Sequence, residues 1–363
     1  MVRGRGFLGL PQGNDESDIP RVPDLARIVH FLRQKLVGKR IVSAFAVDDA
    51  NVFGKVGTSG SAVEKALNGN KVMSAGSQGK YFWITLEKAP HVLMHFGMTG
   101  WVHIRGERTA YTNYYKKMKD SDMDSWPPKF TKFHLTTVGE PVVEVAFTDP
   151  RRFGRVRLID CPGAEIRKHS PLVENGPDPV VDVDIFTEAY LRCKMRSRHV
   201  PIKALLLDQT TISGIGNWVA DETLYHAKIH PEQHCDSLDD AQVATLYRCI
   251  RYVCQTAVDE LGDSDRFPDH WLFNHRWGKS RGPAKLPNGE RLAFVTVGGR
   301  TSCYSPAVQK LTVGDGQAVS PDEPAEAPRP KKKRRTKPKV ETDEEQTAKA
   351  ATPPRRSARL QKS

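Results

Sequence analysis

Residues 212–224 read Ile212-Ser-Gly-Ile-Gly-Asn217-Trp-Val-Ala-Asp-Glu-Thr-Leu224. Gly214 and Gly216 permit a tight, left-handed turn, and Asn217 is expected to cap the helix that follows. Backbone N–H groups at such a helix start suit a phosphate, and the Asn217 side chain can reach the same oxygen. The glycine spacing alone favours an ordinary helix–turn–helix corner, so the phosphate interpretation depends on the rest of the chain.

The sequence on either side of this turn has two kinds of pattern. Upstream, Pro23–Val37 spaces apolar residues at helical intervals, and β-branched and aromatic runs separated by Gly, Pro and Asp follow. These runs predict an antiparallel β-sandwich over Ile41–Val47, Tyr81–Leu86, Val92–Phe96, Trp101–Ile104, Val142–Phe147 and Arg155–Ile159. After Pro162 the spacing predicts helices over Asp184–Met195, Pro201–Asp208, Asn217–Ala227 and Asp239–Leu261. A strand-and-turn module over Trp277–Leu311 completes an α+β fold.

Composition narrows the class of protein. The 363 residues include 55 Lys+Arg against 43 Asp+Glu, a net charge of +12, which favours an anionic partner. Nucleic acid is the leading candidate and a membrane surface the weaker one. No apolar run approaches the roughly 18–20 residues of a membrane span, so no membrane insertion is expected. The six cysteines form no CxxC pair, which argues against a cysteine zinc site and a secreted disulfide framework and favours reduced thiols inside the cell.

The two ends of the chain differ from its body. The tail is rich in Pro, Ala, Glu and Lys, lacks aromatic residues and is predicted to be disordered. Its segment Pro330-Lys-Lys-Lys-Arg-Arg-Thr-Lys-Pro-Lys339 resembles a nuclear localisation signal, and a second basic cluster begins at Pro354. We therefore expect a nuclear protein, the alternative being a solvated tail that adds nonspecific DNA affinity. Residues 1–19 show no periodicity, signal peptide or transit peptide and are expected to be unstructured.

Two predicted turns carry side chains that are suited to contact duplex DNA where its base stack is interrupted. The first is Phe147-Thr-Asp-Pro-Arg151-Arg152-Phe153-Gly154-Arg155, whose tip is expected to display two guanidinium groups and an aromatic ring. An exposed ring fills an unstacked gap in duplex DNA while Arg takes the vacated base position. The alternative is that Phe153 packs in the core.

The second turn is His95-Phe-Gly-Met98-Thr-Gly100-Trp101, preceded by Gln78-Gly-Lys80-Tyr81. Met98 between two glycines is suited to project as a flexible apolar finger, and Lys80 to pair with a phosphate. The alternatives are that Met98 is a core residue and that Lys80 is a solvated charge at a strand edge.

Taken together, in this order and spacing, these segments resemble the formamidopyrimidine-DNA glycosylase/endonuclease VIII (Fpg/Nei) family of base-excision repair. The resemblance covers roughly Pro20 to Leu311. Arg276-Trp-Gly-Lys and Gly298-Gly-Arg300-Thr-Ser are most similar to the plant and fungal branch, whose members replace a four-cysteine zinc finger with a metal-free "zincless" hairpin. The implied organisation is an extension over 1–19, a catalytic β-sandwich domain over 20–162, a helix-two-turn-helix domain over 163–276, a zincless finger over 277–311 and a disordered basic tail over 312–363.

The resemblance also implies roles for individual residues. Met98, Arg151 and Phe153 would fill the void left by a flipped nucleotide, while Lys80, Asn217 and Arg300 would hold the flanking phosphates. Glu222 would belong to the DNA-binding helix-two-turn-helix element, and Lys203 would lie near the lesion. The implied activity is bifunctional: an N-terminal proline amine displaces an oxidised purine and forms a Schiff base that supports strand cleavage. The implied lesions are formamidopyrimidines and hydantoins. The implied partner is duplex DNA that contains oxidised bases or abasic sites. The protein is expected to be a monomer without a cofactor or metal.

The chain departs from the family at the catalytic position. Where the family begins Met-Pro-Glu, this sequence reads Ile19-Pro20-Arg21, and Asp24 stands in the place of a second acid. Within the chain, the Pro20 nitrogen is a tertiary amide, and Arg21 stays charged where a carboxyl group is expected to assist. One interpretation is that the first exon is misread and residues 1–19 are an artefact of the gene model. A second is that this segment is cleaved to expose Pro20.

A third interpretation is a protein that binds lesions or abasic sites without excising them, or that uses Lys203 as a weaker amine nucleophile. A transcription factor built on the helical motif is disfavoured, because it gives no role to Met98, Arg151 and Phe153 and the sequence has no dimerisation zipper.

Overall fold

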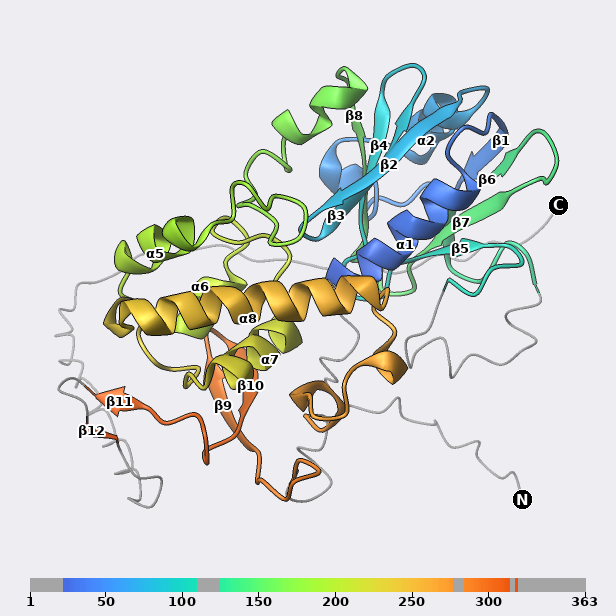
Figure 1. Ribbon diagram of the computed structural model, residues 1–363. Coiled ribbons are helices and arrows are strands. Elements are labelled where there is room, and N and C mark those ends of the chain that lie inside the picture. The colour runs from blue at the N-terminus through green and yellow to red at the C-terminus, as the bar shows by residue number, and fades with distance from the viewer. Residues whose placement is uncertain (1–21, 110–124, 277–283, 314–316, 319–363) are drawn as a thin grey trace, which may run out of the picture. The chain divides into compact units, whose positions relative to one another are not determined.

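The N-terminal part of the chain is a pair of β-sheets flanked by α-helices. A computed structural model describes residues 22–109, 125–276, 284–313 and 317–318 (Figure 1). Helix α1 (Val22–Lys35) packs against strand β2 and buries the apolar face that includes Leu25, Ile28, Val29 and Leu32. One antiparallel sheet has the order β1 (Ile41–Ala46), β6 (Thr131–Thr137), β7 (Glu144–Thr148), β5 (Trp101–Ile104). The other has the order β2 (Val72–Gln78), β3 (Tyr81–Leu86), β4 (His91–His95), β8 (Arg155–Ile159).

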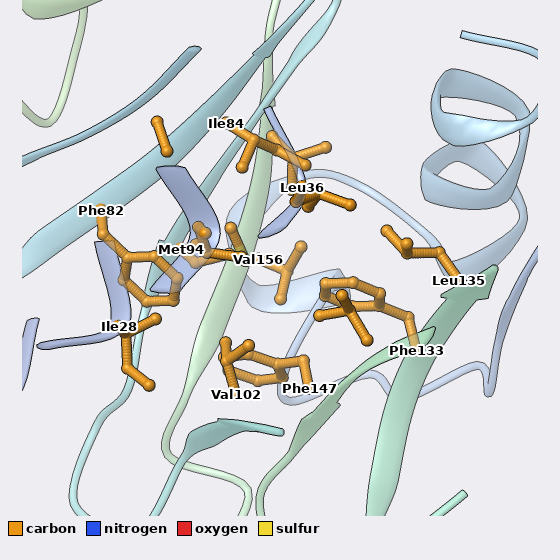
Figure 2. Close-up of a cluster of buried hydrophobic side chains, with 14 of the residues drawn as sticks. Ile28, Leu36, Phe82, Ile84, Met94, Val102, Phe133, Leu135, Phe147 and Val156 are labelled. Atoms are coloured by element: carbon orange, nitrogen blue, oxygen red, sulfur yellow. The ribbon is translucent and has the colours of Figure 1, made fainter. Parts of the chain in front are cut away.

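The apolar faces of the sheets and α1 share one hydrophobic core (Figure 2). Phe82 and Met94 come from one sheet, and Phe133 and Phe147 come from the other, where their rings stack at 5.7 Å between centroids. Burial of this alternating apolar set is the main force that holds two sheets face to face. The predicted β-sandwich is confirmed.

Three elements of this region were not predicted. Helix α2 (Gly60–Leu67) is short and begins at Ser59, whose hydroxyl oxygen accepts a hydrogen bond from Ala62 N at 3.1 Å. Strand β2 contains Gly76 and several small polar residues, and β6 has only two apolar residues, Phe133 and Leu135, among Thr, Lys and His. These compositions lack the continuous β-branched and aromatic character by which the other strands were recognised.

The following region is helical. It contains α5 (Glu188–Arg196), α6 (Ile202–Leu207), α7 (Asn217–Ala227) and α8 (Asp240–Asp259) around a second hydrophobic core. Helix α8 begins with a capping box in which Asp239 and Gln242 bond each other's backbone N–H groups, and it packs against α7 and α1. Short 3₁₀ segments occupy Gly54–Val56, Gly163–Lys168, Cys235–Ser237, Ser264–Arg266 and Leu272–Asn274. None of the helices in the described ranges is long and apolar enough to cross a membrane.

A hairpin follows the helices. Strands β9 (Ala293–Val297) and β10 (Arg300–Tyr304) are joined by Gly298 and Gly299, whose φ values of 58° and 74° are those of a type I′ turn. The short strands β11 (Thr312–Val313) and β12 (Gln317–Ala318) pair with each other. Because of this pair, the prediction of disorder from residue 312 onward was wrong for its first residues. The remainder of the predicted tail and residues 1–19 lie outside the described residues.

Candidate nucleic-acid interface

The turns that carry Met98 and Phe153 are in direct backbone contact. Gly97, at φ +63°, lies so close to the β7–β8 turn that an added Cβ would be 2.4 Å from the Phe153 carbonyl carbon and 2.5 Å from its oxygen. Only glycine fits such an approach at a positive φ without displacing the neighbouring backbone. The absence of a side chain at residue 97 therefore brings the two turns together.

Asp149 fastens the two turns to each other. One of its carboxylate oxygens accepts hydrogen bonds from Thr99 Oγ1 at 2.7 Å and Arg151 N at 3.2 Å, and the other accepts from Gly154 N at 2.6 Å. The Asp149 residue is completely buried. A buried carboxylate that accepts several hydrogen bonds makes a strong tie, because both of its oxygens are satisfied by donors of defined direction.

The side chains of these turns are available to a partner. The Phe153 ring is 44 % exposed, Met98 is half-buried, and the exposed Arg151 guanidinium lies 5.0 Å from the centroid of the Phe153 ring. The structure thus brings the predicted trio together and excludes the alternative in which Phe153 packs in the core. An apolar ring with a guanidinium over its face provides both surfaces that an opened base stack needs.

Arg152 is also exposed, but its side chain is paired with Asp49. Its guanidinium turns back to Asp49, with Nε 2.9 Å from Oδ2 and Nη2 3.0 Å from Oδ1, and Lys132 binds the same carboxylate. Although burial tends to raise the pKa of Asp49, the hydrogen bonds from Arg152 and Lys132 hold that pKa well below its usual range. The turn thus displays both predicted guanidinium groups, but that of Arg152 is held in an ion pair with Asp49, whereas that of Arg151 lies over the Phe153 ring.

The turn that carries Lys80 touches the helix-two-turn-helix segment. A Cβ added to Gly79 would lie 2.9 Å from the Ser213 side chain, and Gly79 N donates to the buried Asp178 at 3.2 Å. Gly214 has a φ of +92°, as the sequence predicted for this turn. The half-buried Lys80 therefore directly follows Gly79, which is held against Ser213 in the turn that precedes Asn217.

Asn217 connects that turn to the hairpin. Its Nδ2 donates to the Thr301 carbonyl oxygen at 3.0 Å, and the exposed Arg300 immediately precedes Thr301. The N-cap of α7 is Gly216, and Asn217 is the first helical residue, so the expected capping role was wrong. The Asn217 side chain binds the hairpin, and no side chain caps the start of α7. Contacts thus link the turns of Lys80, Asn217 and Arg300.

His95 lies next to the Lys80 turn, opposite Tyr81, and was not predicted as a site residue. Burial, together with the charges of Lys80, Arg155 and Arg157, lowers the pKa of His95 to about 4. Nδ1 of His95 accepts a hydrogen bond from Gly97 N at 2.9 Å, so the proton of the neutral ring is on Nε2. The signal available in the sequence was the imidazole at the start of the Gly-Met-Thr-Gly turn.

Lys203 is not placed to act as a nucleophile. Its side chain is completely buried and forms an ion pair with Asp221. The same carboxylate receives hydrogen bonds from Arg276 and from Cys303 N, the latter at 3.0 Å. An amine held as an ammonium ion in a buried pair has no lone pair to attack a sugar. The alternative that assigned this chemistry to Lys203 is therefore corrected.

Glu222 is likewise a structural residue. It is completely buried, and its carboxylate accepts hydrogen bonds from Leu272 N at 3.0 Å and Phe273 N at 2.8 Å and faces His226. Burial raises its pKa against the opposing effect of these partners. Glu222 lies in the helix-two-turn-helix region, as expected, and its buried side chain fastens α7 to residues 272–274.

The predicted catalytic N-terminus is described only from α1 onward. Asp24 is buried in the first turn of α1, where a carboxylate interacts favourably with the positive end of the helix dipole. Pro20 and Arg21 lie outside the described residues.

Two family models match most of the folded chain. The formamidopyrimidine-DNA glycosylase N-terminal domain matches residues 19–156, and the formamidopyrimidine-DNA glycosylase H2TH domain matches residues 176–268. The first match begins one residue before Pro20.

Known proteins resemble the chain in sequence and in fold. Formamidopyrimidine-DNA glycosylase of Arabidopsis thaliana is 37 % identical over 311 residues, which are 85 % of this chain and 75 % of the relative. The enzyme of Pelotomaculum thermopropionicum is 30 % identical over 304 residues, 81 % of this chain and 100 % of the relative. The Lactococcus lactis formamidopyrimidine-DNA glycosylase bound to DNA with an abasic site superposes with a TM-score of 0.64 at 22 % identity, covering 80 % of this chain and 99 % of that one. The chain therefore belongs to the formamidopyrimidine-DNA glycosylase family.

Proposed function

We propose that the protein is a base-excision-repair DNA glycosylase with AP lyase activity that removes oxidised purines, such as formamidopyrimidines and hydantoins, from duplex DNA. The observation that carries this proposal is the pair of turns locked by Gly97 and Asp149, which present Met98, Arg151 and Phe153 together. A duplex that has lost a base from its stack offers a gap for the Phe153 ring and an unpaired base for Arg151.

The basic residues around the turns provide the electrostatic part of binding. Lys80, Asn217 and Arg300 come from three segments that are joined by the Gly79–Ser213 and Asn217–Thr301 contacts. Cations and amide donors arranged in this way suit consecutive phosphates and position the duplex without reading its sequence. The neutral His95 adds an N–H donor beside Lys80.

The chemistry we assign to the family position is that of Pro20. With its nitrogen free, this residue is a secondary amine that attacks C1′ of the damaged nucleoside; the base leaves and an iminium ion forms. The iminium then permits loss of the 3′-phosphate by β-elimination and of the 5′-phosphate by δ-elimination. The burial of Lys203 in its ion pair supports Pro20 as the nucleophile over that amine.

We call Met98, Arg151 and Phe153 the wedge, because they are expected to enter the opened base stack. Its role is tested by Phe153→Ala. We expect affinity for a duplex with an abasic site to fall roughly 5- to 150-fold, because one stacking contact contributes about 1–3 kcal/mol. Affinity for intact duplex should change far less. Phe45→Ala is the matched control, since Phe45 is 52 % exposed on β1 and belongs to neither turn. Equal losses on both duplexes in Phe153→Ala would contradict the wedge.

The chemistry is tested first on protein purified from its native source and then on recombinant protein that begins at the same residue. Mass spectrometry defines its N-terminal peptide, and borohydride is then used to trap an adduct with an abasic duplex. An N-terminal Pro20 and a trapped adduct that Pro20→Gly weakens would support the lyase. Failure to trap despite a free Pro20 amine would contradict it.

A lesion-binding protein without excision is the second candidate. It is favoured by Arg21, which stands where the family has an acid and cannot donate a proton at neutral pH. Selective binding to an abasic duplex without base release or trapping would establish this function, and it leaves the role of Phe153 intact.

We also propose that the protein acts in the nucleus. The basic run over residues 330–339, which lies outside the described residues, is the feature that supports nuclear import. A fluorescent fusion should lose nuclear accumulation when Lys331, Lys332 and Lys333 are changed to Ala. Unchanged accumulation in that variant would contradict the proposal.

A further inference from the structure

Two histidines and one aspartate gather on the side of the helical region where α6 begins. His199 lies in the connection between α5 and α6, and His234 and Asp236 lie between α7 and α8. One candidate ligand atom from each residue lies within 4.8 Å of the other two. None of the three residues has a role in the interface described above, and the cluster contains no cysteine ligand.

Two backbone segments hold the cluster together. Ile202 N donates to Gln233 O at 2.7 Å and Cys235 N to Val200 O at 2.9 Å, on either side of an antiparallel bridge between Pro201 and His234. Residues 35 positions apart in the sequence are therefore kept in fixed register. The spacing of His199 and His234 resembles no linear metal motif, which is why the sequence did not indicate this cluster.

The side chains of the cluster are in contact with one another. The His199 and His234 rings are 4.0 Å apart between centroids, and His199 Nδ1 is 2.8 Å from Asp236 Oδ2. The His199 side chain is 72 % exposed, so it is free to adjust its position. Nδ1 of His234 is buried without a hydrogen-bond partner among the described residues. That ring therefore has no competing hydrogen bond through this nitrogen.

Neighbouring groups leave the three ligands available. The Cys235 thiol donates to the carbonyl oxygens of Met195 and Arg198, so it is already engaged and does not compete with the three ligands. Arg196 donates to the Asp236 carbonyl oxygen at 2.7 Å and pairs with Asp240, and Arg198 pairs with Asp208. The nearby positive charges are thus offset by carboxylates outside the cluster.

We propose that His199, His234 and Asp236 form a binding site for a zinc-class divalent cation. Two imidazoles and one carboxylate are a donor set that Zn²⁺ takes in tetrahedral sites, with water in the fourth position. Bonds of about 2.0–2.2 Å imply ligand separations of roughly 3.4 Å. Movement of the exposed His199 ring brings the cluster to that spacing, and the cation takes the place of the hydrogen bond between His199 and Asp236.

Such a cation would cross-link the start of α6 to the α7–α8 connection. The same two segments are joined by a hydrogen bond from Lys203 N to Pro231 O at 3.3 Å. The cross-link would therefore lie near the backbone of Lys203, whose side chain pairs with Asp221. The consequence is stabilisation of the helical region. This site is separate from the finger, where the family resemblance implies that metal is absent.

The test uses the full-length protein freed of metal with a chelator and titrated with ZnCl₂ by calorimetry. All variants carry Cys193→Ser, because Cys193 is an exposed thiol that would bind zinc on its own. We expect one zinc ion per chain and a rise in Tm of a few degrees at a large excess of zinc over Kd. His199→Ala and Asp236→Asn should each weaken binding roughly tenfold or more.

The matched control is His270→Ala, which removes an exposed histidine of the same region outside the cluster. It should keep the parental stoichiometry and affinity. Substitution of Co²⁺ for zinc should give visible absorption bands that His199→Ala removes. Equal zinc affinity in all variants, or no binding at 100-fold molar excess of zinc over protein, would overturn the proposal.

Discussion

Asp149 decides the position of the wedge through one side chain. The residue belongs to the β7–β8 turn, yet it bonds Thr99 of the β4–β5 turn as firmly as its own neighbours. In Asp149→Asn, an amide N–H₂ replaces an acceptor and faces at least one donor. We expect a loss of about 1–3 kcal/mol in the free energy of unfolding, together with weaker discrimination between abasic and intact duplex.

The measurements are urea unfolding and binding to the two duplexes. Asp49→Asn serves as the comparison, because it weakens the Arg152 anchor and leaves the Thr99 contact intact. Selectivity for the abasic duplex that survives in Asp149→Asn would contradict the role we give to this carboxylate.

At this scale the sequence indicates exposed residues better than buried ones. Met98, Arg151 and Phe153 were identified from residue type within short turns, and those turns depend on local glycines. The complete burial of Lys203 and Glu222 was not predicted, because burial of a charged side chain depends on distant partners. Lys203 pairs with a residue 18 positions away, and Glu222 binds N–H groups 50 and 51 positions away.

The β4–β5 turn provides a test at the scale of an element. Gly97→Ala places a Cβ within 2.5 Å of the Phe153 carbonyl group, so one of the two turns has to move. We expect destabilisation of about 3 kcal/mol or more and loss of preference for the abasic duplex.

Gly106→Ala is the matched control for this change. Gly106 also has a positive φ, +81°, but an added Cβ there meets no atom within 4 Å. It should show only the strain of the left-handed conformation, about 1–2 kcal/mol, with unchanged DNA selectivity. Similar behaviour of the two alanine variants would show that contact between the turns is unimportant.

Elements with a strong apolar period were predictable, and those without one were not. Helix α8 and strands β3, β5 and β8 were found close to their observed positions because each presents a continuous apolar face or run. Strands β2 and β6 are recognisable only beside the neighbours that complete their sheets. The capping role of Gly216 was missed because the competing contact of Asn217 is with Thr301, 84 residues away.

The whole molecule should lose stability in mild acid. Burial lowers the pKa of both His95 and His103 to about 4, whereas an unfolded histidine titrates near 6.5. Between these values the unfolded chain binds protons that the folded chain does not, so the free energy of unfolding decreases as pH falls from about 6.5 to 4. The expected loss is on the order of 2–3 kcal/mol per histidine.

The measurement is urea unfolding at pH 7.5 and pH 5 for the parent, His95→Gln and His103→Gln. Burial raises the pKa of Asp178 and Glu222, which changes stability in the opposite direction, so the comparison between variants is the informative quantity. Each glutamine variant should show a smaller decrease than the parent. A decrease of the same size in all three proteins would contradict the assignment to these rings.

The buried pair of Lys203 and Asp221 has a consequence for the ancestry and engineering of the hairpin. Asp221 takes its remaining hydrogen bonds from Arg276, before the hairpin, and from Cys303, within it. A foreign hairpin grafted after residue 276 has to supply a donor at the same point, or it leaves a carboxylate oxygen enclosed without its partner. The hairpin is therefore not an interchangeable module. Recombination that exchanges it also has to exchange the parts of α6 and α7 that carry Lys203 and Asp221.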